Sequence, residues 1–428
     1  MAPPRPRWET ASKKQAPAKS QKPLKARVQH EVVPLAEPSI PLDLQQVLLN
    51  IFKNAFAQRF EADIKPLLQQ VKGHLYNRDF ATAFGKNEYL EAYAARWSPS
   101  RALGYAHLFM DLRAQLWPEV AGAKETKRRR VVCLGGGAGA ELVALAAVQK
   151  MLWRESQDQA PAKMDIKNVD IADWTAVVHL LAKHVTILPP LSKYASAAVQ
   201  AANAALVDPG SFDVSFSKLD VLHVEHGILS ETLNSAHLVT LMFTLNELYS
   251  TSLPLTQKFL LNLTSALASG ALLLVVDSPG SYSTITLNGA DKKYPMQWLL
   301  DHTLLQTGEK DKNKELAKWE KIHEDESRWF RLAHTLQYPI DLENMRMQLH
   351  LVVGAKTGDM NAVKLRSTGW AANALPVYCY RSEQRVSQVL INLLLRLIRS
   401  EFLRSVRDAE PCPLWDDAYN GATRFTDS

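Results

Sequence analysis

The sequence predicts an α/β fold built on a mostly parallel sheet, because short apolar runs typical of strands alternate with helical patterns along the middle of the chain. Strands that alternate with helices pair in parallel, with helices on both faces of the sheet. The strand-like runs lie at residues 131–135, 165–170, 212–217, 237–243 and 271–277. Helical patterns separate them at about 139–153, 173–186, 226–234 and 245–268.

A basic tail and a helical subdomain are predicted before the first strand. Residues 1–30 carry eight Lys or Arg and a single acid, a net charge of +7, whereas the rest of the chain has a net charge of −1. The tail, spanning residues 1–40, is rich in Pro, Ala, Ser and Lys, so we expect it to be disordered. It could contact nucleic-acid phosphates, serve as a nuclear address, or only keep the chain soluble. Apolar residues at helical spacing then predict a subdomain over residues 41–120, with helices at 42–72, 79–95 and 100–116.

The last third of the chain predicts an antiparallel closure of the sheet. Strand-like runs at 345–353 and 375–380 are close enough to pair as a hairpin. The polar stretch 309–332 mixes both charge signs, so we expect an exposed helix there, with Trp329 and Phe330 packed. An amphipathic helix is predicted at 383–407. These patterns predict a sheet domain over residues 121–382, followed by a C-terminal helix and tail over 383–428.

Composition makes several classes of protein unfavourable. With 46% hydrophobic residues, the chain can bury a core. Its most apolar stretch, residues 389–398, is short and contains Arg396, so we expect no membrane span. The three cysteines are scattered, which fits a reducing compartment, and the twelve histidines show no metal-ligand spacing. We therefore expect no metal site and no membrane partner.

The glycine-rich segment LGGGAGAEL, residues 134–142, is the main candidate site. It ends the first predicted strand, and in an open parallel sheet ligands bind beyond the carboxyl ends of the strands. Glycines let the backbone approach a ligand closely, and the following helix directs its free N–H groups at the same place. A tight structural turn is the alternative interpretation. The candidate residues are Gly135, Gly136, Gly137, Gly139 and Glu141.

Two acids follow the next two predicted strands. Asp170 ends the second strand, where a carboxylate can accept hydrogen bonds from two ribose hydroxyls. Asp220 follows the third strand, where it can bond an adenine amino group or only close a turn. Asp173 competes with Asp170, although capping the next helix is its more favoured role. A dinucleotide fingerprint can be forced onto the loop, but the closing hairpin favours a methyltransferase fold that binds S-adenosylmethionine.

Several motifs resemble the fungal large-subunit rRNA uracil-N3 methyltransferases. They are the glycine segment, VDIADW at 169–174, FTLNELY at 243–249, LLLVVDSPGSYS at 272–283 and YAARWSPSRALGY at 93–105. The last is the most specific, since no general methyltransferase rule demands it. The resemblance covers residues 42–407. It departs from the broad methyltransferase pattern at Cys133, which stands where an acid two residues before the first glycine is usual.

The resemblance implies a Rossmann-like class I methyltransferase that uses S-adenosylmethionine. It further implies an enzyme of the nucleolus that methylates N3 of one uridine in the large-subunit (25S) rRNA during ribosome biogenesis. The partner would be that rRNA or a preribosome, and we expect the chain to act as a monomer.

Methylation of uracil N3 requires a base for the N3 proton and donors aimed at the two carbonyl oxygens. The candidates follow the fourth and fifth predicted strands. We expect Asn246 or Ser278 to orient the uracil, Asp277 or Glu247 to accept the proton, and Thr244 to lie beside the cofactor. Alternatively, Asn246 and Thr244 only cap a helix, and Asp277 only stabilises the next turn.

The arginines of the RWSPSRALGY stretch are further candidates. Arg96 and Arg101 could bind the methionine carboxylate or an RNA phosphate through two parallel hydrogen bonds, and Trp97 could cover the ligand. The alternative is that Ser98 and Pro99 simply begin a helix.

Three other functions stay open from the sequence alone. They are a methyltransferase for a protein or small molecule, a non-catalytic assembly factor with the same fold, and an NAD-dependent dehydrogenase. The glycine loop with Asp170 argues against a non-catalytic assembly factor, and the closing hairpin argues against an NAD-dependent dehydrogenase.

Overall fold

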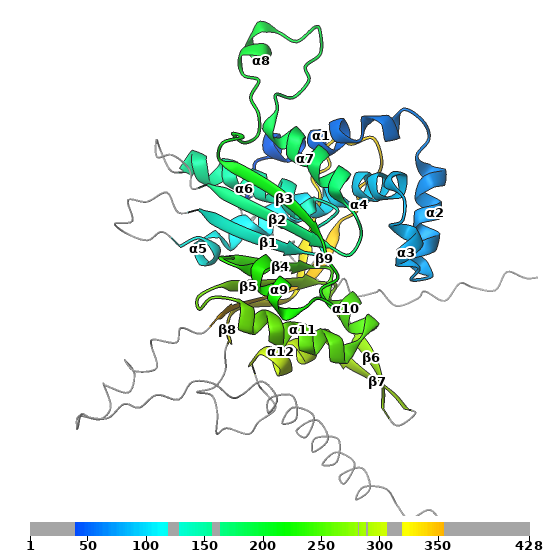
Figure 1. Ribbon diagram of the computed structural model, residues 1–428. Helices are drawn as coiled ribbons and strands as arrows, with labels where there is room; N and C mark the ends of the chain where they lie inside the picture. Colours follow the sequence, from blue (N-terminus) through cyan, green and yellow to red (C-terminus); the bar gives the residue numbers. More distant parts are fainter. Residues whose placement is uncertain are drawn as a thin grey trace, which may run out of the picture. The chain divides into compact units, whose positions relative to one another are not determined.

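The computed structural model of the chain describes residues 39–118, 128–155, 163–280, 282–287, 290–305 and 319–354. Its main feature is a seven-stranded sheet in the order β3-β2-β1-β4-β5-β9-β8 (Figure 1). The first five strands pair in parallel, and β9 and β8 close the sheet antiparallel. The strands are β1 Arg129–Leu134, β2 Met164–Asp170, β3 Phe212–Lys218, β4 Leu238–Met242, β5 Leu272–Asp277, β8 Trp319–Phe330 and β9 Met345–Gly354.

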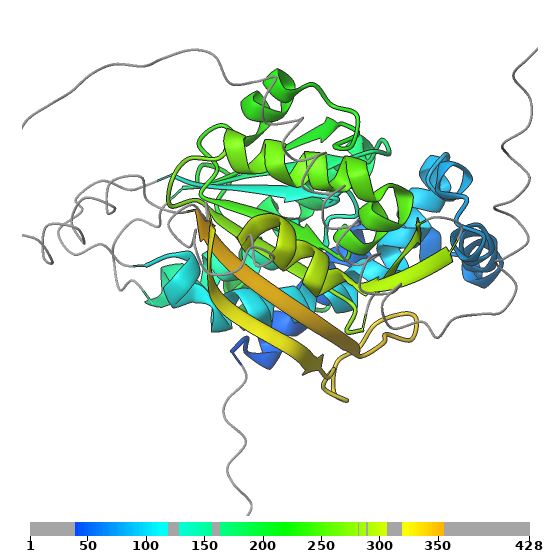
Figure 2. The same ribbon diagram turned by 90° about the horizontal axis from the view of Figure 1, so that it is seen from below.

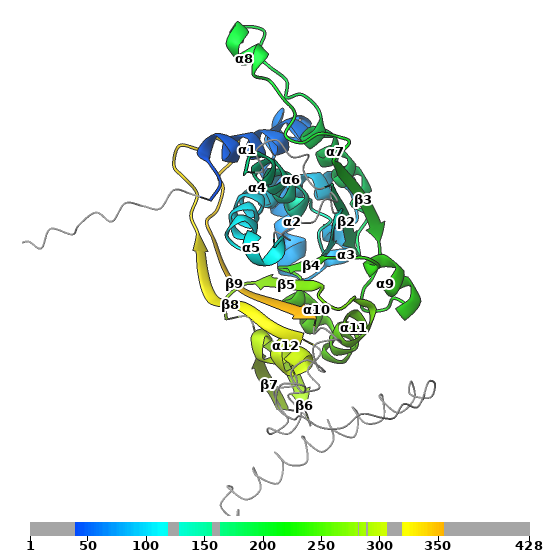
Figure 3. The ribbon, with the colours of Figure 1, turned by 90° about the vertical axis from the view of Figure 1, so that its left-hand side faces the viewer.

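Helices cover both faces of this sheet, as expected for parallel strands. Figure 3 shows α1, α4 and α6 on the concave face and α11 and α12 on the other. The first face carries α1 Leu42–Ala55, α4 Asn87–Asp111, α6 Ala140–Glu155 and α7 Thr175–Thr186. The second carries α9 His226–Leu233, α10 Leu245–Thr251, α11 Leu253–Ala266 and α12 Met296–Leu305. Every residue of the central strands β4 and β5 is buried, because both faces are covered.

Shorter elements complete the chain. They are η1 Ala57–Phe60, α2 Lys65–Tyr76, α3 Phe80–Ala83, α5 Arg113–Leu116, α8 Ala197–Ala201, and the separate hairpin of β6 Tyr282–Leu287 with β7 Ala290–Pro295. The segment that carries α8 projects from the sheet between α7 and β3 (Figure 1).

Helix α4 contains Pro99 in its interior and still runs unbroken. Proline lacks an N–H, so the carbonyl of Ala95, four residues earlier, loses its helical donor. The hydroxyl of Tyr338 donates to that carbonyl at 2.7 Å. This hydrogen bond comes from the connection between β8 and β9, so a distant part of the chain completes the helix.

The five parallel strands predicted from the sequence are confirmed, and so is the antiparallel closure. The strand predicted at 345–353 is β9, but its partner is β8 rather than residues 375–380, which lie outside the described residues. The helix predicted over 309–332 is wrong for residues 319–330, which form β8. There Phe330 is buried as expected, but Trp329 is exposed.

Two predicted helix boundaries also need correction. The separate helices expected at 79–95 and 100–116 are largely one helix, α4, because Tyr338 compensates for Pro99. The single helix expected at 245–268 divides at Ser252, whose side chain caps α11 by accepting the N–H of Leu255. Residues 1–38 of the predicted tail and the helix predicted at 383–407 lie outside the described residues, whereas Ile40, at the end of the predicted tail, is buried in the core.

Candidate active site

The candidate site lies at the carboxyl edge of the parallel strands. The glycine loop follows β1, Asp170 ends β2, residues 243–247 follow β4, and Asp277 ends β5. Since β1 lies between β2 and β4, these segments meet at one edge of the sheet. This is where open α/β sheets bind their ligands.

The glycine loop is closely packed between two neighbouring segments. Gly135 has φ of +80°, a backbone conformation that side chains disfavour. A Cβ atom on Gly135 would overlap the Thr244 side chain, and one on Gly137 would overlap the indole ring of Trp174. The run of glycines is therefore required by both conformation and space.

Asp170 lies directly against this loop. Its carboxylate accepts the N–H of Gly137 at 3.2 Å and the N–H of Ala172 at 3.1 Å. Burial raises the pKa of Asp170, and the two backbone donors oppose that shift. The Trp174 side chain and the backbone of Ile171 also contribute hydrogen bonds that oppose the shift, so Asp170 is held firmly against the segment that follows β2.

A second carboxyl, Glu141, is buried beneath the loop at the start of α6. Its Oε1 accepts a hydrogen bond from the hydroxyl of Thr240, on β4, at 3.2 Å. Burial raises the pKa of Glu141 to about 7. Cys133, in the position where methyltransferases commonly have an acid, is buried nearby on β1. In this chain the acid under the loop is thus supplied by α6.

Helix α4 forms the wall of the site above the glycine loop. The hydroxyl of Ser98 donates to the carbonyl of Ala138, within the loop, at 2.8 Å. Arg101 donates to the hydroxyl of Tyr93 at 2.8 Å, and its guanidinium carbon lies 5.3 Å from the centre of the Phe243 ring. Arg96 pairs with Glu343, and its guanidinium carbon lies 5.8 Å from the centre of the Trp97 ring. Arg101 therefore lies against Tyr93 and Phe243, whereas Arg96 is held by Glu343 beside Trp97.

An aromatic cluster surrounds the same place, and sequence reasoning missed most of it. Tyr93 lies at the centre, with ring centroids 5.3 Å from Phe84, 4.8 Å from Trp97 and 5.8 Å from Trp174. Trp97, a candidate cover for the ligand, belongs to this cluster. The only sequence signal for Tyr93 and Trp174 is their position within the resembling motifs, and Phe84 lies outside all of them. Their contacts join segments that are distant in the sequence.

The segments after β4 and β5 are held together by Asp277. Its buried carboxylate accepts the N–H of Asn246 at 3.0 Å and that of Ser278 at 2.8 Å. Burial raises the pKa of Asp277 to about 6. The side-chain oxygen of Asn246 is buried and has no hydrogen-bond partner within the described part of the chain. Asp277 therefore caps the start of α10, while the Asn246 carboxamide is left with an unused acceptor.

The remaining predicted residues are less central. Glu247 lies 3.4 Å from the guanidinium of Arg78 in an ion pair, and Thr244 donates to the carbonyl of Met242. Asp220 accepts the N–H of Leu222 at 3.0 Å and contacts Nδ1 of His223 at 2.7 Å, so it closes its own turn. Asp173 accepts both the N–H and the hydroxyl of Thr175 at the start of α7, the capping role considered for it.

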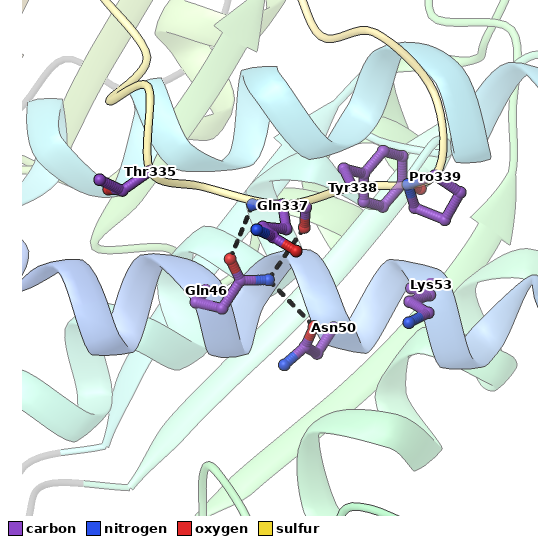
Figure 4. Close-up of a pocket in the computed structure, with 7 residues that line it drawn as sticks. All are labelled: Gln46, Asn50, Lys53, Thr335, Gln337, Tyr338 and Pro339. Carbon is purple, nitrogen blue, oxygen red and sulfur yellow. Dashed lines mark hydrogen bonds between the residues drawn. The ribbon is translucent and has the colours of Figure 1, made fainter.

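A groove of about 680 Å³ lies elsewhere, between α1 and the connection from β8 to β9 (Figure 4). There the Gln46 side chain accepts the N–H of Gln337 and donates to its carbonyl, both at 2.9 Å. These bonds hold the connection that carries Tyr338. None of the residues lining the groove belongs to the glycine loop or to the segments after β4 and β5.

Within the described ranges, no group of three or more His, Cys, Asp or Glu side chains could hold a metal ion. Nor is any helix in those ranges both long and apolar enough to cross a membrane.

The strand order, the closing antiparallel pair and the glycine loop beside Asp170 define a Rossmann-like S-adenosylmethionine-dependent methyltransferase. The chain belongs to the SAM-dependent methyltransferase family Methyltransf_34, whose model matches residues 52–353. It is also 35% identical over 328 residues to the 25S rRNA (uridine(2843)-N(3))-methyltransferase of Saccharomyces cerevisiae. That match covers 72% of this chain and 85% of the yeast protein. The resemblance described from the sequence motifs is thereby confirmed.

Solved structures of methyltransferases are more distantly similar. A SAM-dependent methyltransferase from Methanosarcina mazei shares 9% identity, with 56% of this chain and 98% of that chain covered and a TM-score of 0.30. SAM-bound CalS10, an amino pentose methyltransferase from Micromonospora echinaspora, shares 12% identity with this chain. The match covers 60% of this chain and 92% of that chain, with a TM-score of 0.28.

Proposed function

We propose that this enzyme transfers a methyl group from S-adenosylmethionine to N3 of a uridine in large-subunit rRNA. The observation that carries the proposal is the 35% identity, over most of both chains, to a yeast enzyme named for that reaction. Two further observations support it: the glycine loop is hydrogen-bonded to Asp170 at the carboxyl ends of the parallel strands, and a buried carboxylate, Asp277, lies at the same edge.

The residues present fit S-adenosylmethionine. The glycine loop follows β1 at the carboxyl edge of the sheet, and Thr244 and Trp174 hold it in place by filling the space beside Gly135 and Gly137. Asp170 supplies a carboxylate for the ribose hydroxyls, and Arg101 offers a guanidinium for the methionine carboxylate. Glu141 supports the loop from below, Thr244 packs on it, and Asp220 lies next to Asp170 along the same edge. When bound, S-adenosylmethionine supplies an electrophilic methyl group to the nucleophile.

The nucleophile, uracil N3, must lose its proton before or during attack. We infer that Asp277 accepts it, because a carboxyl with a pKa near 6 is close to the ideal for a base at neutral pH. Its two hydrogen bonds to backbone N–H groups fix its orientation and leave other acceptor positions open. Glu247 is the weaker candidate, since it pairs with Arg78.

Orientation of the base is assigned to Asn246 and Ser278. Asn246 follows β4 next to Asp277, and the side-chain oxygen of Asn246 is buried without a partner among the described residues. The amide can donate to a uracil carbonyl, where negative charge develops as the N3 proton leaves. Ser278 follows Asp277 directly, and its carbonyl accepts the side-chain amide of Gln348, which fixes the turn.

The proposal extends to location and partner. We infer that the enzyme works in the nucleolus on rRNA or a preribosome, as a monomer. The basic N-terminal tail, with its net charge of +7, would serve as a nuclear address or as a contact to rRNA phosphates.

The reaction can be tested with purified protein, labelled S-adenosylmethionine and large-subunit rRNA from cells that lack this gene. We expect 3-methyluridine as the product. Asp277→Asn should lower kcat at least 100-fold, the range typical for loss of a general base, with little change in cofactor affinity. Glu247→Gln should have a smaller effect, and Asp213→Asn, at the opposite edge of the sheet, should have none.

Two results would contradict parts of this scheme. A folded Asp277→Asn protein with the wild-type rate would remove Asp277 as the base. Equal turnover on a protein or small-molecule substrate without RNA would contradict the choice of substrate.

A further inference from the structure

We propose that Trp329, Arg331 and Arg346 form an RNA-binding surface that holds a nucleotide next to the target uridine. The proposal rests on the proposed function and adds the place where the enzyme grips its substrate. We call these three residues the edge surface, because they lie on or directly after the two outer strands, β8 and β9 (Figure 2).

The register of the sheet places this surface beside the active site. Asp277 on β5 pairs with Gln348 on β9, and Arg346, two residues earlier on β9, pairs with Trp329 on β8. Side chains two residues apart on a strand share a face, so Gln348 and Arg346 point to the same side. Two strand spacings and two residue rises separate Asp277 from Trp329, about 12 Å between backbones. A nucleotide adjoining a uridine in the site can reach that far.

The side chains of the edge surface are arranged as a site for a base and phosphates. Trp329 is 51% exposed, although neighbouring Phe330 is buried. The guanidinium carbons of Arg331 and Arg346 lie 5.0 and 5.7 Å from the centre of its ring. Single-stranded nucleic acid is bound by this combination, in which a base stacks on an aromatic ring and cations contact the backbone.

The two arginines are available for an anionic ligand. Neither forms an ion pair with a carboxylate among the described residues, whereas Arg328, just before Trp329, pairs with Asp111. Among the described residues, Arg346 donates a hydrogen bond through its Nε alone, to the hydroxyl of Ser327 at 2.8 Å. Its terminal nitrogens stay available for a phosphate.

Local strand geometry presents Trp329 to solvent. The pairing of β8 with β9 shifts register between Asp325 and Arg328, and such irregularities redirect the side chains that follow. A second copy of the chain is a less suitable partner than RNA, because a two-fold contact would bring the arginines of one copy against those of the other.

The test compares RNA binding by two variants and a matched control. The variants are Trp329→Ala and the double change Arg331→Gln with Arg346→Gln. The control is Trp153→Ala, because Trp153 is similarly exposed, at 47%, has Lys150 5.1 Å from its ring, and lies at the other end of α6 from the glycine loop. The probes are a labelled single-stranded uridine-containing RNA in fluorescence anisotropy and S-adenosylmethionine in calorimetry.

We expect Trp329→Ala to weaken RNA binding and raise KM for rRNA about tenfold, with kcat and cofactor affinity unchanged. The double arginine variant should reduce the slope of log affinity against log salt by about 1.4, as expected for two lost phosphate contacts on a single strand. The control should bind RNA as the wild type does.

Three outcomes would overturn the edge surface. If both variants bind RNA with wild-type affinity, only the edge-surface proposal is overturned. Methylation of rRNA by the wild type would still support the proposed function. A loss of dimer mass in Trp329→Ala, measured by light scattering, would show that Trp329 joins two copies instead. A wild-type protein that neither binds nor methylates RNA would overturn both proposals.

Discussion

At the scale of single residues, the glycine loop is held by close contacts on either side. Gly137 both faces the Trp174 ring and donates its N–H to Asp170. A methyl group at this position must therefore displace either the indole or the loop. The loop cannot shift without breaking its hydrogen bond to the residue that we assign to the ribose.

We predict that Gly137→Ala lowers S-adenosylmethionine affinity at least tenfold, a loss of about 1.4 kcal/mol in binding free energy. Calorimetric titration would measure it. The matched control is Gly73→Ala in α2, where a Cβ would meet nothing within 4 Å. That change should leave cofactor binding intact and add about 0.5–1 kcal/mol to stability, because alanine favours a helix. Equal cofactor affinity in both variants would contradict the assignment of the loop.

The buried carboxyl of Glu141 makes stability depend on pH. Its pKa rises from 4.5 to about 7 on folding because of burial, so the folded state holds the proton more tightly than the unfolded state. The contribution of the Glu141 proton to the free energy of unfolding is fully present below pH 4.5. It is lost as pH rises from 4.5 through 7. The loss amounts to at most about 3 kcal/mol in the free energy of unfolding.

We therefore expect Glu141→Gln to flatten the pH dependence of Tm between pH 5 and 7 in the cofactor-free protein. Glutamine keeps an oxygen for the Thr240 hydroxyl and has no proton to lose. Glu320→Gln, at an exposed position, serves as the control. Thermal melts that fall equally steeply in wild type and Glu141→Gln would argue against a neutral Glu141 in the fold.

Some of the site was predictable at this scale and some was not. Glycines after a β-branched strand, and an acid ending the next strand, are local signals, and the structure does bring Gly137 and Asp170 together. The roles of Tyr93 and Trp174 depend on α4 packing over the loop, a contact between distant segments that no local pattern specifies. Asp220 illustrates the reverse case, since its turn contacts with Leu222 and His223 account for it locally.

At the scale of elements, two long-range contacts decide what the sequence leaves ambiguous. The first is α4, where Pro99 indicates a helix boundary until Tyr338 supplies the missing donor. The second is β8, whose exposed and half-buried positions alternate but are occupied by charged residues. Lys321 on β8 pairs with Asp301 on α12 at 2.6 Å, so polar contacts replace the apolar ones that would have indicated a strand.

We predict that Tyr338→Phe destabilises the protein by about 1–3 kcal/mol, because it leaves the buried Ala95 carbonyl without a donor. In a Pro99→Ala background the helix regains its own N–H, so the same change should cost about 1 kcal/mol less. Chemical denaturation of the wild type, Tyr338→Phe, Pro99→Ala and the double variant would measure both differences in the free energy of unfolding. Tyr76→Phe at an exposed position of α2 should be neutral. Equal losses in the two backgrounds would show that Tyr338 acts independently of Pro99.

At the scale of the whole molecule, one buried cluster joins the N-terminal helices to the sheet. Phe52 of α1 and Phe109 of α4 belong to the same cluster as Val131 of β1 and Leu142 of α6. The helices before the sheet therefore contact the candidate site, through the hydrogen bond from Ser98 to Ala138 in the glycine loop, rather than only preceding the sheet. The parallel sheet was predictable because its strands are buried on both faces and so are apolar throughout. The position of α4 over the loop was not.

The central claim, that this enzyme forms 3-methyluridine in large-subunit rRNA, is tested most directly by nucleoside mass spectrometry. The rRNA would come from cells with and without this gene. We predict loss of 3-methyluridine at one site, restored by the wild-type gene but not by Gly137→Arg, which fills the space occupied by Trp174. An unchanged nucleoside profile in cells without the gene would contradict the claim.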